Sequence, residues 1–149
     1  MFSGINSSAS ALTAQRLRMD VTSANMSNAD STRGRLVDGE WEPYRRKMVS
    51  ISPNETGFSS HLNRAMESSG YEAEGVKVDS IVEDESPFRR VYQPEHPDAD
   101  GEGYVELPNV DPLKEMTNMM SATRSYEANI TTMNASKNMM LKALEIGRG

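Results

Sequence analysis

The stretch RMDVTSANMSNADSTRGR, residues 18–35, combines Met and Val with many Ser, Thr, Asn and Asp residues, yet contains no helix breaker before Gly34. It belongs to a segment without Gly or Pro that runs from residue 5 to 33, and a second such segment runs from 113 to 146. All seven prolines fall between these segments or at their edge, from Pro43 to Pro112. This distribution predicts two long terminal helices, each spanning up to ~45–50 Å at ~1.5 Å per residue, around a broken middle.

The C-terminal segment has signals for both ends of a helix. Asp111 can cap a helix whose first residue is Pro112, and Gly147 can end it, which predicts a helix over about 112–146. Positions spaced by seven residues, offset by three, form one continuous stripe on this helix. Its apolar members, which we expect to form an assembly interface, are Met116, Met119, Tyr126, Ile130, Met133, Met140 and Leu144.

The N-terminal segment carries a narrower stripe of the same kind. Ile5, Leu12, Met19 and Met26 recur every seven residues and complete the predicted assembly interface. The surrounding Ser, Thr and Asn are poor helix formers, so this helix should be marginal in isolation. We therefore expect it to pack closely among neighbouring helices, some of them from other chains; an intramolecular helical hairpin with a polar outer face is the alternative.

The middle of the chain changes period. Asp38-Gly39 is a two-residue hairpin signal between strand-like runs, and further short runs around residues 76–82, 88–91 and 105–107 predict an insert of two to four strands. Residues 52–75 resemble a loop. The basic cluster YRRKM, residues 44–48, reads as a solvated strand face, so that removing one of its charges should have little effect.

These patterns predict an α+β fold with long N- and C-terminal helices packed as a coiled-coil-like pair and a small β-rich insert. The expected organisation is an N-terminal helical assembly segment over 1–33, a β-rich insert over 34–110 and a C-terminal helical assembly segment over 111–149.

Charge and composition exclude several classes of function. The net charge is −6, and residues 34–110 carry 16 acidic against 8 basic groups, while both ends are nearly neutral. This argues against nucleic acid as a partner, because phosphate binding needs clustered Lys and Arg. The mean hydropathy is −0.64, and the sequence shows neither a membrane span nor a signal-peptide pattern. There is no Cys, which excludes disulfides and thiolate chemistry.

No catalytic constellation is recognisable. His61 and His96 are isolated in loop-like sequence, and no phosphate-binding loop or serine elbow occurs. The acidic run PDADGEGYVE, residues 97–106, hints at a calcium loop, but the twelfth position from Asp98 is Asn109, where an EF-hand needs Glu. An acidic turn before a strand is the preferred interpretation. We expect no enzyme activity, no cofactor and no metal.

Several ordered motifs together resemble one family. ALTAQRLRMDVTSANMSNADSTRG (11–34), PYRRKMVS (43–50), PDADGEGYVELPNVDPLKEM (97–116), ATRSYEAN (122–129) and KALEIG (142–147) are similar to motifs of the bacterial flagellar axial proteins, most closely those of the proximal rod of the basal body. The resemblance covers about residues 8–147. One departure is STRGRLVDG, residues 31–39, which lacks the Gly-Tyr that usually follows the first motif.

The resemblance implies a structural subunit of the flagellar rod. Such subunits are exported unfolded through the flagellar type III apparatus without a cleaved signal peptide, and their terminal helices pack in the inner wall of a helical tube that passes torque from motor to hook. The implied partners are other copies of the chain, other rod proteins and the export apparatus. A secreted helical-hairpin effector and a cytosolic coiled-coil adaptor remain the alternatives.

Overall fold

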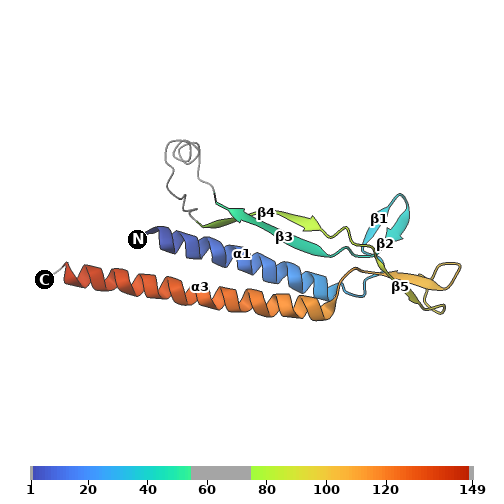
Figure 1. Ribbon diagram of the computed structural model, residues 1–149. Coiled ribbons are helices and arrows are strands. Elements are labelled where there is room, and N and C mark those ends of the chain that lie inside the picture. Colours follow the sequence, from blue (N-terminus) through green and yellow to red (C-terminus); the bar gives the residue numbers. More distant parts are fainter. Residues whose placement is uncertain (1, 55–74, 148–149) are drawn as a thin grey trace, which may run out of the picture. The chain divides into compact units, whose positions relative to one another are not determined.

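A computed structural model describes residues 2–54 and 75–147 (Figure 1). In chain order the elements are α1 (Phe2–Ser27), β1 (Arg35–Val37), β2 (Glu40–Glu42), β3 (Lys47–Pro53), β4 (Val76–Glu83), β5 (Arg89–Tyr92), β6 (Tyr104–Leu107) and α3 (Pro112–Ile146). The α+β prediction is confirmed, although the described ranges hold six strands where two to four were expected. Most of the predicted loop, residues 55–74, lies outside the described residues.

The chain divides into two compact units. The first unit comprises the described residues of Met1–Leu17, Ser50–Ser80 and Ala122–Gly149, and the second comprises Arg18–Val49 and Ile81–Ser121. Both helices therefore contribute one part to each unit. We describe each unit by itself.

Helix α3 begins and ends where its sequence signals predict. The Asp111 carboxylate accepts hydrogen bonds from the backbone N–H groups of Leu113 at 2.9 Å and Lys114 at 3.3 Å, as an N-cap should. At the other end, the Gly147 N–H donates to the Ala143 carbonyl at 3.1 Å. The predicted bounds of this helix are confirmed.

Helix α1 buries small and polar side chains, not its largest ones. Ser8 and Ala14 are buried in the first unit, and Val21, Thr22 and Asn25 are buried in the second. Small residues let a helix approach its neighbours closely, so a segment poor in large apolar groups can still pack as a helix. Within the polar stretch at residues 18–27, α1 therefore buries Val21, Thr22 and Asn25. The burial of Asn25 is explained by its hydrogen bonds, described below.

The Asp38-Gly39 signal forms the predicted hairpin. β1 and β2 pair antiparallel with Leu36 opposite Trp41, and Asp38 and Gly39 have φ angles of 52° and 90°. Positive φ at both central positions is the requirement of a type I′ turn, which Asp-Gly meets at low cost.

Two further strand pairs follow. β3 pairs with β4, and β5 pairs antiparallel with β6, where Tyr92 lies opposite Tyr104 with the rings edge to face at 5.3 Å. The turn before β6 is held by Asp100, which accepts backbone N–H bonds from Glu102 and Tyr104, both at 2.9 Å. The acidic turn predicted before a strand is confirmed.

The apolar core is thin in both units. Among the described residues the buried hydrophobic side chains are Ala14, Val21, Ala29, Val105, Val110 and Ala122. They include no Leu, Met or aromatic residue. Since large apolar side chains supply about 1.5–3 kcal/mol each when fully buried, this core gives the isolated chain little stability.

Candidate functional site

A saturated polar cluster lies at the C-terminal end of α1 in the second unit. Asn25 is 1% exposed. Its amide nitrogen donates to the Lys47 carbonyl at 2.8 Å and to Glu115 Oε2 at 3.0 Å, while its amide oxygen accepts from the Tyr44 hydroxyl at 3.0 Å and the Lys47 N–H at 2.9 Å. All four hydrogen bonds of this amide join α1 to β3, to the segment before it and to α3.

The second centre of the cluster is a buried ion pair. Glu115, in the first turn of α3, is 1% exposed, and the Arg46 side chain is 12% exposed. Arg46 Nε and Nη2 both reach Glu115 Oε1, at 2.9 and 2.8 Å, and Asn118 donates to the same oxygen at 3.2 Å. Burial alone lowers the pKa of Arg46, but Glu115, and then Asp84, raise it above its ordinary value.

Asn109 and Asp84 extend the polar cluster to the segments before α3 and after β4. Asn109 accepts the Arg46 N–H at 2.8 Å and donates to the carbonyls of Asp84 and Ser86 at 2.9 and 3.1 Å. Hydrogen bonds from Ser86, and then Arg46, lower the pKa of Asp84. Burial, and then the charge of Glu115, raise the pKa of Tyr44. The hydrogen bonds of the polar cluster therefore join α1, β3 and α3 to the segments before β3, after β4 and before α3.

This geometry corrects the interpretation of YRRKM. Arg46 is not on a solvated strand face, because its guanidinium neutralises a buried carboxylate. Arg45 instead lies over the Phe88 ring at 4.4 Å, and Lys47 is exposed. Breaking a buried pair from one side leaves an uncompensated charge, so the expectation of a mild effect is wrong for Arg46.

The predicted apolar stripe divides between the two units. Met19, Met26, Met116 and Met119 belong to the second unit, and the others belong to the first. Most stripe residues are half-buried, but Met116 is 50% exposed and Leu144 is 69% exposed. At the start of α3 it is Glu115, next to Met116, that is buried.

Large apolar side chains are exposed along α3. Leu113, Met116 and Met120 follow one another at helical spacing on its first two turns in the second unit. Met139, Leu141, Leu144 and Ile146 are exposed on its last two turns in the first unit. Contiguous apolar exposure such as that of Leu113, Met116 and Met120 marks surfaces that other proteins cover.

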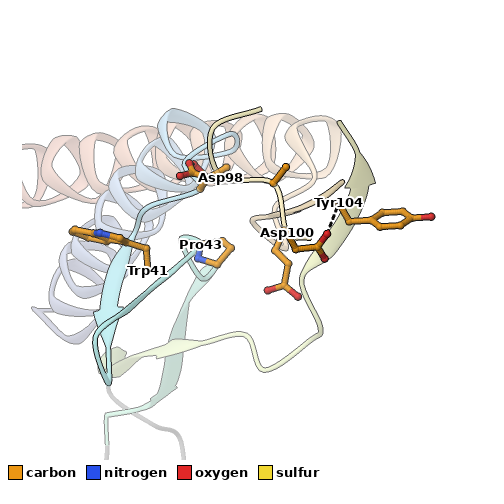
Figure 2. Close-up of a pocket in the computed structure, with 8 residues that line it drawn as sticks. Trp41, Pro43, Asp98, Asp100 and Tyr104 are labelled. Atoms are coloured by element: carbon orange, nitrogen blue, oxygen red, sulfur yellow. Dashed lines mark hydrogen bonds between the residues drawn. The ribbon is translucent and has the colours of Figure 1, made fainter. Parts of the chain in front are cut away.

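A hollow of about 350 Å³ lies in the second unit, beside Asp98 and Asp100. Figure 2 shows the side chains that line it. Asp98 binds Arg33 Nε and the Thr32 hydroxyl, both at 2.8 Å, and Asp100 binds Arg90 at 2.7 Å. The Tyr104 ring points away from the hollow. Both carboxylates are thus already occupied by hydrogen bonds within the chain.

Within residues 2–54 and 75–147, no group of His, Asp or Glu side chains is arranged to hold a metal ion. In the same ranges neither helix has an apolar stretch long enough to cross a membrane. Of the two histidines only His96 is described, and its Nδ1 accepts the Asp98 N–H at 3.1 Å.

Sequence comparisons give a consistent result. Residues 5–34 match the family described as flagella basal body rod protein, and residues 102–146 match the C-terminal family of flagellar basal body rod FlgEFG proteins. The chain is 60% identical over 147 residues to the flagellar basal-body rod protein FlgC of Bacillus subtilis, covering 99% of this chain and 98% of that protein. It is 44% identical to FlgC of Escherichia coli over 93% and 92% of the two chains, and 43% identical to FlgC of Borreliella burgdorferi over 100% and 99%.

Proposed function

The chain belongs to the FlgC family of flagellar basal-body rod proteins, and from that premise we propose that it polymerises through its two terminal helical segments, residues 1–33 and 111–149. It is a structural subunit of the basal-body rod, and the comparisons do not favour an effector or an adaptor. In this role the polymer is a drive shaft that passes torque from the motor to the hook.

One observation carries the proposal: the helices expose large apolar side chains, while the buried residues that the structure describes include no Leu, Ile, Met or aromatic side chain. Leu144 is 69% exposed and Ile146 is 81% exposed, yet the buried residues of α1 in the same unit are Ser8 and Ala14. When neighbouring subunits cover this apolar surface, its removal from water favours assembly by about 25 cal/mol of free energy per Å² of covered area. Repeated in every subunit, this term favours the polymer over the monomer.

The acidic residues 34–110 form the part that contacts neighbouring subunits on the outside of the rod. Their many surface carboxylates suit polar contacts that fix orientation between subunits. A mechanical role of this kind needs no catalysis, cofactor or metal, and we infer that the chain is not an enzyme.

The partners in this proposal are other copies of the chain, other rod proteins and the type III export apparatus. Export requires an unfolded chain, and a thin apolar core keeps the free energy of unfolding of the chain small. The subunit would reach the basal body without a cleaved signal peptide and without inserting into the membrane.

A charge placed in the predicted stripe tests the proposal. Met133 is half-buried in the C-terminal part of α3, and the adjacent Asn134 is exposed. Met133→Asp introduces a carboxylate into a surface that assembly would make dry, which costs several kcal/mol at every repeat. In a strain whose own copy is deleted, we expect this variant to be exported but to form no hook or filament.

Asn134→Asp is the matched control, since it adds the same carboxylate one residue away on the exposed side. It should support normal hooks and swimming. Wild-type swimming by Met133→Asp would contradict the assignment of this stripe to the assembly interface.

A further inference from the structure

A basic cavity opens between α1, β3 and α3 in the second unit. It has a volume of about 230 Å³, and its lining includes Arg18 from α1, Lys47 from β3 and Lys114 from α3. All three side chains are exposed, and none forms an ion pair with another described residue. Three elements thus contribute basic residues to the lining of one cavity in a chain whose net charge is −6, although the Lys47 ammonium itself lies over the Tyr44 ring, 5.7 Å from its centroid.

The interior of this cavity suits a carboxylate carried on an apolar support. Its lining has four basic residues against one acidic residue, and that one, Glu115, is already bound to Arg46. Val21, Met48 and Val49 supply apolar wall. Thr22, 4% exposed, also lines the cavity, and its hydroxyl has no hydrogen-bond partner among the described residues.

The β1–β2 hairpin has the complementary chemistry. Asp38 and Glu40 at its tip form no ion pair within the described ranges, whereas Glu42 at its base binds Arg35 at 3.0 Å. Leu36 and Trp41, opposite each other on one face, are each 56% exposed. The hairpin therefore presents two free carboxylates at a tip of fixed geometry, with Glu40 on the face opposite to the exposed pair of Leu36 and Trp41.

We propose that the hairpin tip of one copy inserts its carboxylates into the basic cavity of a neighbouring copy. The inference rests on the proposed function, since it names a contact between subunits of the rod. The two surfaces are different patches of the same chain, so the contact is head to tail, and repeated head-to-tail contacts that do not close generate helical polymers. Each inserted carboxylate then meets the basic lining of the cavity.

Because the chain contains no Cys, an engineered cysteine pair gives an unambiguous test. Glu40→Cys and Lys114→Cys are introduced together, basal bodies are isolated under oxidising conditions, and the chain is detected on a non-reducing gel. We expect a ladder of species at multiples of the 16.5 kDa chain mass, because every chain carries a cysteine on each side of the head-to-tail contact. Pairing Glu40→Cys with Asn134→Cys, an exposed position elsewhere on α3, should leave the chain monomeric.

A purely monomeric band from basal bodies that contain the Glu40→Cys/Lys114→Cys chain would overturn this contact and leave the rod function standing. Cross-linking of the Glu40→Cys single variant to a different protein would overturn the choice of a second copy. Absence of even the wild-type chain from isolated basal bodies would count instead against the rod function itself.

A charge exchange gives a second test that does not depend on oxidation. Lys114→Glu and Glu40→Lys should each cause loss of swimming, and the double variant should restore it, because the pair is re-formed with the signs exchanged. Glu in the first turn of a helix is electrostatically favourable, so Lys114→Glu should leave α3 intact. Normal swimming by both single variants would overturn the proposal.

Discussion

The two ends of α3 differ in what they bury and what they expose. At its start, in the second unit, Glu115 is buried and is bound by Arg46, Asn25 and Asn118 of the same chain. At its end, in the first unit, Leu144 and Ile146 face solvent. The buried polar cluster at the start of α3, the polar end, forms its hydrogen bonds and ion pair within one subunit. The exposed apolar side chains at the other end of α3, the apolar end, need neighbouring subunits to cover them. Buried polar side chains in this chain therefore hold one subunit together, whereas exposed apolar side chains mark surface that we expect neighbouring subunits to cover.

The strongest way to break the polar end is to remove one side of its ion pair. Arg46→Ala leaves Glu115 buried without a counter-charge, and we expect the free energy of unfolding of the second unit to fall by about 3–5 kcal/mol. The single Trp, Trp41, lies in this unit, so urea unfolding followed by its fluorescence measures the change.

Arg89→Ala is the matched control, because Arg89 is exposed and forms no ion pair among the described residues. It should change the free energy by less than about 0.5 kcal/mol. Equal unfolding midpoints for Arg46→Ala and Arg89→Ala would contradict the role given to the buried pair.

Asn25→Ala should have the next largest effect. It removes four hydrogen bonds and leaves Glu115 and the Lys47 backbone with fewer partners, at a cost of about 2–4 kcal/mol. Ser23→Ala, at an exposed position of the same helix, should be neutral or slightly stabilising because Ala is the better helix former. The same urea experiment distinguishes them, and a neutral Asn25→Ala would show that the junction is redundant.

The smallest effect concerns pH. Folding lowers the pKa of Asp84 from its ordinary value of 3.8, so its contribution to stability is fully present above that pH and is lost as the pH falls through the folded-state pKa. Below roughly pH 4, the free energy of unfolding of the second unit should depend less on pH in Asp84→Asn than in the wild type. Urea midpoints at several acidic pH values measure this, and parallel curves for the two proteins would contradict it.

The elements that the sequence predicts correctly have local causes. Asp111, Pro112 and Gly147 define α3, and Asp38-Gly39 defines the hairpin, because caps and turns are decided by neighbouring residues. The short strands β5 and β6 follow the runs predicted around residues 88–91 and 105–107, and in β6 Val105 and Leu107 alternate with the exposed Tyr104 and Glu106.

The polar cluster could not be predicted because its members are far apart in sequence. Arg46 and Glu115 are 69 positions apart, and no local pattern distinguishes Arg46 from Arg45. The seven-residue spacing identified Met116 as a stripe residue but gave no indication that its neighbour Glu115 is buried within the chain. The place of Met116 in the assembly interface stays a prediction. One weak signal for the buried position did exist: Asn25 is a polar residue directly before Met26, which belongs to the predicted stripe.

Hydrogen exchange of the dilute monomer tests most directly the claim that the polar end is complete within one chain and the apolar end is not. We expect slow exchange of the backbone N–H groups of residues 22–27, 46–49 and 115–119, and fast exchange over residues 5–14 and 130–146, which become protected only when the chain assembles. Uniform protection along both helices in the dilute monomer would contradict this account, because the terminal segments would then need no partner.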